Sequence, residues 1–184
     1  MKTRFVKDRI DYTGRELRPH WIMERFGLVG DAAVSFAGSC YVSGEDLVDL
    51  EDRALGNTVA GDLMLHFIVE LFGIALPGIV FAQRLLCSAA KDAIEETGDG
   101  AVRRDGDDLF AGTGKLSVSV ATVSPVSGLI HMGLNITREG VPVEAACLED
   151  LKIDPAAVAD RILASFSGEI ESAMEAASKV RPVI

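Results

Sequence analysis

The sequence is poor in cysteine, and its cysteines are far apart. Cys40, Cys87 and Cys147 are odd in number and contain no Cys-x-x-Cys spacing. This pattern supports neither a disulfide framework nor a structural zinc site. Cys87 has apolar neighbours in a predicted helix and is interpreted as a small buried hydrophobic residue. Nothing near Cys40 or Cys147 predicts a base that would activate a thiolate, and we expect no metal site.

Basic residues are also scarce. Lys and Arg number 18 against 28 Asp and Glu, which gives a formal net charge of −10 and a pI near 4.7. This charge opposes nonspecific binding to nucleic acid, because the counterion release that drives such binding would be missing. Arg103 and Arg104 are the only adjacent basic pair. Nucleic acid is therefore not an expected partner.

Long uninterrupted apolar segments are missing as well. The most hydrophobic run, residues 63–86, is interrupted by polar residues and a proline, namely His66, Glu70, Pro77, Gln83 and Arg84. Such residues are costly in a membrane helix. The first nine residues are charged throughout and contain no apolar signal-peptide core. We expect a cytoplasmic protein without a membrane partner.

The composition that remains is that of a globular protein with an adequate core. The chain has 184 residues, 48% of them hydrophobic, and a mean hydropathy of +0.25, which fits one domain over residues 1–184. Patterning predicts α+β, a mostly antiparallel sheet flanked by helices. Helices are expected over 19–26, where Pro19 is in the first turn and Gly27 follows the end, over 79–97, and over 155–179 with Asp154 as the cap. Ser43 followed by Asp46 predicts the cap of a further helix that runs through Ala54, with a strand over 47–50 as the alternative. The expected strands are 32–36, 40–42, 63–71 and three or four more within 101–137.

Two segments show strict alternation and dominate the functional prediction. From Lys115 to Val120 the residues alternate polar and apolar, and from Ile130 to Ile136 they do so again. A turn centred on Val126 would pair Ser119 with Gly133 and Ser117 with Asn135. Apolar residues would then face the core, namely Leu116, Val118, Val120, Ile130, Met132, Leu134 and Ile136.

The opposite face of this predicted hairpin is mostly small. It would carry Lys115, Ser117, Ser119, His131, Gly133 and Asn135. A solvated strand face usually carries Thr, Lys, Glu and Arg, whereas small residues leave room for a ligand to lie on the sheet. We interpret this face as a ligand-binding floor, with a solvent face as the alternative. A serine hydrolase built from Ser117 or Ser119, His131 and an Asp is a third alternative, although no nucleophile elbow surrounds either serine.

Several acidic residues have competing interpretations. Asp105, Asp107 and Asp108 offer ligands for Mg²⁺, but a solvated turn is favoured because the rest of a calcium-loop motif is missing. Asp46, Asp49, Glu51 and Asp52 are interpreted as a solvated helix face. His66 and Glu70 would chelate a metal only in a helix, and we expect a strand. His66 is then a hydrogen-bonded core histidine, and a buried Glu70 would need a cationic partner such as Arg84.

Residues 107–135 resemble the catalytic core of the biotin and lipoate protein ligases. The matching residues are Asp107-Asp108-Leu109, Gly112-Thr113-Gly114-Lys115 and His131-Met132-Gly133-Leu134-Asn135. The resemblance implies a class II synthetase-like fold in which Lys115 contacts an acyl-adenylate. The arginine- and glycine-rich nucleotide loop of those enzymes has no convincing counterpart, since only Gly14-Arg15 and Phe36-Ala37-Gly38-Ser39 stand in its place.

Over its whole length the chain is similar to the mainly archaeal family Domain of Unknown Function 366. The similarity is carried by Gly30-Asp31, residues 65–70, 104–109, 115–119 and 130–135. That family is similar in fold to the ligases but brings no settled activity. The resemblance therefore supports the fold more than the reaction.

Together these features predict a ligase- or transferase-like protein that binds a small carboxylate or adenylate-like ligand on the polar face. Lys115 would be its catalytic residue, and the expected ligand-binding residues are Ser117, Ser119, His131, Gly133, Asn135, Asp107, Asp108 and Arg104. The alternative is a noncatalytic small-molecule-binding protein that has lost the nucleotide loop. Whether ATP or Mg²⁺ is a cofactor stays open, and so does a homodimer.

Overall fold

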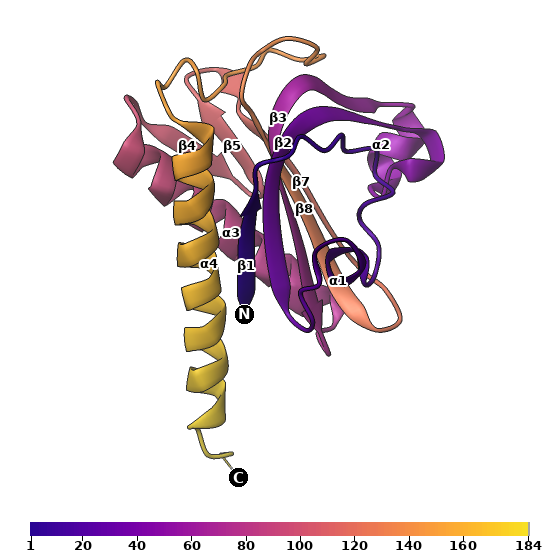
Figure 1. Ribbon diagram of the computed structural model, residues 1–184, viewed down its shortest axis with the longest axis vertical. Helices are drawn as coiled ribbons and strands as arrows, with labels where there is room; N and C mark the ends of the chain where they lie inside the picture. The colour runs from indigo at the N-terminus through magenta and orange to yellow at the C-terminus, as the bar shows by residue number, and fades with distance from the viewer. Residues whose placement is uncertain (184) are drawn as a thin grey trace.

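A five-stranded sheet forms the centre of the computed structural model, which describes residues 1–183 (Figure 1). The strand order is β1-β2-β3-β8-β7, and only the β1–β2 pair is parallel. The bounds are β1 (Lys2–Val6), β2 (Ala32–Ser43), β3 (Thr58–Phe72), β7 (Ser117–Val123) and β8 (Ser127–Asn135). The α+β prediction with a mostly antiparallel sheet is confirmed.

Two long helices cover one face of this sheet, which we call the back face. Helix α3 (Leu76–Thr97) begins three residues before its predicted start, and α4 (Pro155–Ser178) begins as predicted. The Asp154 carboxylate accepts a hydrogen bond from the amide of Ala157 and caps α4. Apolar side chains of both helices pack on the sheet in one large buried cluster, which includes Leu86, Ile94, Ile162 and Phe166.

A second sheet, of three strands, is formed by the residues that precede β7 in the sequence. Its strands are β4 (Val102–Asp105), β5 (Asp108–Ala111) and β6 (Gly114–Lys115). The chain changes sheets at Leu116, because Lys115 pairs with Phe110 whereas Ser117 pairs with Leu134. The predicted three or four strands of residues 101–137 are therefore five, divided between two sheets.

This change of sheet overturns the predicted register. Ser117 pairs with Leu134 and Ser119 with Met132, one residue away from the predicted pairing. A shift of one residue moves side chains to the other face. Leu116, Ile130, Met132, Leu134 and Ile136 lie in the back core as predicted. Val118 and Val120 do not, and pack instead with the cluster on the opposite, front face.

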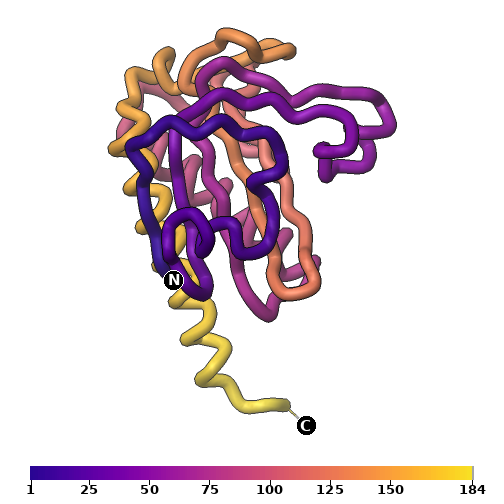
Figure 2. The backbone as a smooth tube through the Cα atoms, turned by 45° about the vertical axis from the view of Figure 1, so that its right-hand side comes forward, coloured from indigo at the N-terminus to yellow at the C-terminus, as the bar shows by residue number. Residues whose placement is uncertain are grey.

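The amino-terminal segment crosses the front face. The amides of Ile10 and Tyr12 donate to the carbonyls of Ala37 and Ser39, where β2 carries an irregularity between Gly38 and Cys40. A Cβ on Gly38 would lie 1.9 Å from the carbonyl oxygen of Ile10, so only glycine allows this crossing. Figure 2 shows the segment, in indigo, passing over the strands before it returns to α1 (Trp21–Phe26), within the predicted helix 19–26.

The connection between β2 and β3 protrudes from the body and contains two short helices. These are the 3₁₀ turn η1 (Gly44–Asp46) and α2 (Leu50–Leu55) (Figure 1). Asp49, rather than the predicted Ser43, caps α2 by accepting from the amides of Glu51 and Asp52. The helix expected to follow a Ser43 cap and run through Ala54 therefore begins only at Leu50.

Within residues 1–183, no helix combines the length and the apolar character needed to cross a membrane.

Candidate functional site

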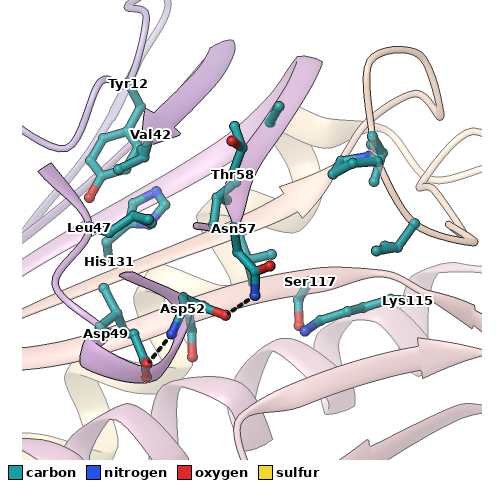
Figure 3. A pocket seen from close by; sticks show the side chains of 18 of the residues that line it. Tyr12, Val42, Leu47, Asp49, Asp52, Asn57, Thr58, Lys115, Ser117 and His131 are labelled. Atoms are coloured by element: carbon teal, nitrogen blue, oxygen red, sulfur yellow. Dashed lines mark hydrogen bonds between the residues drawn. The ribbon is translucent and has the colours of Figure 1, made fainter. Parts of the chain in front are cut away.

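A pocket of about 440 Å³ lies at the front face, between the β2–β3 connection and strands β7 and β8 (Figure 3). This volume falls in the range of small-molecule sites. Its apolar lining comes from Val42, Leu47, Val48, Val59, Ala60, Val118, Val120, Val141, Pro142 and Val143. Its polar lining comes from Tyr12, Asp46, Asp49, Asp52, Asn57, Thr58, Asp108, Lys115, Ser117, Ser119, His131 and Asn135.

Lys115 is held in place on both edges of its short strand. It pairs with Phe110 on one side, and on the other its amide donates to the carbonyl of Glu144 while its carbonyl accepts from the amide of Ala146. Its ammonium lies 2.9 Å from the Asp108 carboxylate, and each of these side chains is 32% exposed. The pocket therefore contains a cation whose backbone is fixed and which is paired with one partly exposed carboxylate.

Asn135 positions this lysine. Its side-chain amide donates to the carbonyls of Lys115 and Ala146, each at 3.0 Å, and the residue is 3% exposed. Its amide group thus joins the end of β8 to the Lys115 strand and to the 144–146 segment. Both Lys115 and Asn135 border the pocket, as the sequence predicts, but the Asn135 amide hydrogens serve the protein.

Ser117 and Ser119 border the pocket but direct their hydroxyls to the back face. The Ser117 hydroxyl accepts from the amide of Leu109. The Ser119 hydroxyl accepts from Gln83 Nε2 and donates to the Asp107 carboxylate, 3.2 Å away. His131 lies on the front face, so the predicted diagonal contact between Ser119 and His131 is wrong and the serine-hydrolase arrangement is not formed.

Three of the residues expected to bind ligand lie outside the pocket lining. Asp107 accepts from Arg84 Nη1 at 2.6 Å and from Gln83 Nε2 at 2.9 Å, which ties it to α3. Arg104 donates to the carbonyl of Gly106 in the β4–β5 turn. Gly133 lies beneath Met64, whose Cε would be 2.9 Å from an added Cβ.

His131 belongs to a buried aromatic and polar cluster. Tyr12 stacks on its ring with 3.6 Å between centroids, and His131 Nε2 lies 3.1 Å from His66 Nδ1. Burial lowers the pKa of His66 to about 4, and burial together with nearby His66 lowers the pKa of His131 well below its usual value. Both rings are neutral at neutral pH, and the predicted hydrogen-bonded core histidine is confirmed for His66.

The hydrogen-bond partners of Glu70 differ from the predicted cationic partner. Its carboxylate is buried and accepts from the amide of His20 at 2.9 Å and from the hydroxyl of Ser127 at 2.7 Å. Arg84, the expected partner, pairs with Asp107 instead. Backbone and hydroxyl donors replace the cation because Arg84 belongs to α3 and reaches the turn before β5.

The acidic wall of the pocket was missed by the sequence interpretation. Asp46, Asp49 and Asp52, taken above as a solvated helix face, line the cavity together with Asn57. Asp46 pairs with Arg15 at 3.6 Å, Asp49 caps α2, and Asp52 accepts from the Asn57 amide at 2.9 Å. The signal was the cluster of four acidic residues itself, but only the folding of the connection over β7 brings it to the pocket.

Metal and thiol chemistry gain no support here. Residues 1–183 contain no group of three or more His, Cys, Asp or Glu side chains arranged to hold a metal ion. All three cysteines are unpaired and buried. Burial raises the pKa of Cys40 to about 12 and that of Cys87 to about 11, so both thiols stay protonated at neutral pH.

The fold places the chain among proteins with a biotin and lipoate ligase-like architecture. A biotin protein ligase from Aquifex aeolicus, solved with biotin and ATP, superposes with a TM-score of 0.62 at 16% identity, covering 92% of this chain and 70% of the ligase. A putative lipoate protein ligase from T. acidophilum with bound lipoic acid gives 0.63 at 16% identity, covering 93% and 87%. These likenesses establish the fold.

Residues 1–181 match the family described as "Domain of unknown function (DUF366)", and the chain belongs to this family. An uncharacterized protein from Methanocaldococcus jannaschii is 36% identical over 98% of this chain and 84% of its own length. The structure of a protein of unknown function from Pyrococcus horikoshi is 39% identical and superposes with a TM-score of 0.94 over the whole of both chains.

Proposed function

We propose that the pocket binds a small molecule whose carboxylate or acyl-adenylate end lies at Lys115, and that the protein is ligase- or transferase-like. The observation that carries this proposal is the backbone of Lys115, bonded on both edges, with its ammonium at the cavity. A cation held in this way stabilises charge that develops on carbonyl or phosphate oxygens without reorganising. The similarity in fold to biotin and lipoate ligases supports the same function.

The test starts from a mass-spectrometric survey of small molecules that copurify with the protein. Binding and turnover of any molecule found are then compared between the native protein and Lys115→Ala. We expect turnover to fall by about a hundredfold or more, as when a group aimed at developing charge is removed. Lys152→Ala is the matched control, because Lys152 pairs with Asp99 on the exposed surface and lies outside the pocket lining. Unchanged binding and turnover in Lys115→Ala would contradict the proposal.

One observation favours a second function, a noncatalytic binding protein without nucleotide chemistry. Asp46, Asp49 and Asp52 line the same pocket as Lys115. Carboxylates repel a triphosphate, and Lys115 is already paired with Asp108.

The two functions differ in what ATP does. Pyrophosphate release is measured with ATP and either biotin or lipoic acid, the ligands named for the similar structures, and with any copurifying carboxylate. ATP-dependent release that disappears in Lys115→Ala would support the enzyme. Tight binding of a small molecule without any such release would support the binding protein.

A further inference from the structure

The pocket is unusually rich in hydrogen-bond acceptors and negative charge. Four aspartates line it, namely Asp46, Asp49, Asp52 and Asp108, against one lysine. Asp108 is paired with Lys115, and Asp46 is within 3.6 Å of Arg15. Among residues 1–183, Asp49 and Asp52 have no ion-pair partner. The uncompensated charge in the pocket is therefore negative.

The two unpaired carboxylates are held in position by the protein. Asp49 accepts from two amides at the start of α2, and Asp52 accepts from the Asn57 side chain. Figure 3 shows Asp49, Asp52 and Asn57 on the side of the β2–β3 connection, with Lys115 reaching in from the other side. The pocket thus has an acidic wall and a basic end.

His131 adds an acceptor whose orientation follows from its neighbours. His66 Nε2 lies 3.3 Å from the carbonyl oxygen of Gly38, which can only accept, so His66 carries its hydrogen on Nε2. His66 Nδ1 is then an acceptor, and His131 must donate to it from Nε2 at 3.1 Å. In the neutral ring, His131 Nδ1 is therefore left with a lone pair.

This lone pair remains accessible from the pocket. His131 is 3% exposed and lines the cavity. Within the described part of the chain, the one side-chain hydrogen bond of His131 is that through Nε2, and Ser35 Oγ is the one fully enclosed side-chain polar atom without a partner, so His131 Nδ1 is not fully enclosed. His131 pairs with Val120 of β7, and Val118 and Val120 line the same pocket as His131. A buried acceptor of this kind is matched by a ligand N–H donor.

We propose that the ligand carries a protonated amine in addition to its carboxylate, as an amino-acid-like zwitterion does. Its amine contacts the acidic wall of Asp49 and Asp52 and the His131 acceptor, and its carboxylate contacts Lys115. The apolar lining, with Val118, Val120 and Leu47, covers the hydrocarbon between the two ends. The carboxylate half of this assignment rests on the function proposed above, whereas the amine half rests on the acidic wall and the histidine pair.

Four straight-chain probes with six carbons separate these contributions: 6-aminohexanoate, hexylamine, hexanoate and hexanol. Their dissociation constants are measured by calorimetry or NMR titration at low ionic strength, where charge interactions are least screened. We expect 6-aminohexanoate to bind about tenfold more tightly than hexanoate, and hexylamine more tightly than hexanol. Hexanoate binding as tightly as 6-aminohexanoate, or no binding of any amine at millimolar concentration, would overturn the proposal.

Variants assign the two ends of the ligand. The double variant Asp49→Asn, Asp52→Asn removes two charges but keeps a helix-capping side chain at position 49, so the fold should survive. It should reduce the preference for the amine probes by about five- to tenfold. Asp99→Asn, an exposed aspartate outside the pocket lining, is the control and should leave the preference unchanged. An undiminished preference in the double variant would overturn the role of the acidic wall.

Lys115→Met distinguishes failure of this inference from failure of the proposed function. It should weaken 6-aminohexanoate and hexanoate while leaving hexylamine unchanged. Suppose that Lys115→Met loses hexanoate binding and that the native protein shows no preference for amines. This result would overturn the proposal of a zwitterionic ligand and would leave the carboxylate function standing. Suppose instead that the native protein prefers amines and that Lys115→Met binds hexanoate unchanged. This result would overturn the carboxylate function and would leave amine recognition standing.

Discussion

The two faces of the sheet treat their polar side chains in opposite ways. On the back face, Ser117 and Ser119 are bonded to Leu109, Gln83 and Asp107. On the front face, His131 bonds to the protein through one nitrogen, and Lys115, Asp49 and Asp52 line a cavity. The polar residues of the two alternating segments therefore differ in whether the protein itself satisfies their hydrogen bonds. Ser117 and Ser119 under the helices are satisfied by the protein, whereas Lys115 and His131 on the front keep capacity for a ligand.

The difference follows from what covers each face. Helices α3 and α4 exclude water from the back face, so a polar group there is costly unless it has an internal partner. The front face is covered only in part, by the amino-terminal segment with the short helix α1 and by the β2–β3 connection. If this comparison is correct, changes on the back face should affect stability most, and changes at the pocket should affect binding most.

The largest effect on stability is expected in the back core. Phe166→Ala removes a fully buried aromatic side chain from α4 and should lower the free energy of unfolding by about 3–5 kcal/mol. Urea denaturation measures this change. Met174→Ala, on the same helix but 67% exposed, is the control and should change stability by less than about 0.5 kcal/mol. Equal effects of the two substitutions would contradict the packing of α4.

The second-largest effect is a fall in the free energy of unfolding at acidic pH, caused by the buried His66 on the front face. The pKa of His66 is about 4 in the folded protein against 6.5 for an unperturbed histidine, so the unfolded chain binds the proton more readily between these values. The contribution is fully present above pH 6.5 and is lost as the pH falls toward 4. One pKa unit corresponds to about 1.4 kcal/mol, so the full loss, reached once the pH is below 4, is on the order of 3–4 kcal/mol.

Unfolding free energies of the native protein and His66→Gln, compared at about pH 7 and about pH 5, isolate this contribution. Carboxylates titrate in both proteins, so the difference between the two slopes is the quantity of interest. The His66→Gln variant should be less sensitive to pH than the native protein. Identical slopes would show that the buried histidine pair is not the source of the acid sensitivity.

A smaller effect on stability is expected for Asp107, which we assign to the back face. Asp107→Ala removes the acceptor of Gln83, Arg84 and Ser119. Its side chain is 31% exposed, so solvent replaces part of the loss, and the free energy of unfolding should fall by about 1–2 kcal/mol. The exposed neighbour Asp105 is the matched control. If Asp107→Ala lost ligand binding without losing stability, Asp107 would have to be assigned to the ligand-binding site instead.

The smallest change in stability is expected for Lys115→Ala. Lys115 and Asp108 form a partly exposed pair, and such pairs contribute less than about 1 kcal/mol. The melting temperature should therefore stay close to that of the native protein, although binding is expected to fail. A variant that unfolds at room temperature would show that Lys115 belongs to the scaffold and would remove the contrast between the two faces.

Much of the fold could be predicted from local pattern. The Asp154 cap and the apolar periodicity that follows it predicted α4, and Pro19 with Gly27 predicted α1, because these signals act within one or two turns of helix. The large apolar residues from Leu63 to Leu71 predicted a buried strand, which the structure extends to Thr58–Phe72. Ile130, Met132 and Leu134 were assigned to the core correctly for the same reason.

The sequence by itself determined the two long helices, the buried strand β3, the core of β8, and Lys115, His131 and Asn135 as residues bordering one site. Only the tertiary structure decided the register, since Leu116 joins two sheets and no local signal marks a one-residue change of phase there. It also decided that Asp49 and Asp52 line the pocket and that Glu70 is satisfied by His20 and Ser127. These contacts join residues far apart in the chain, and alternation along a strand carries no information about which distant segment will cover it.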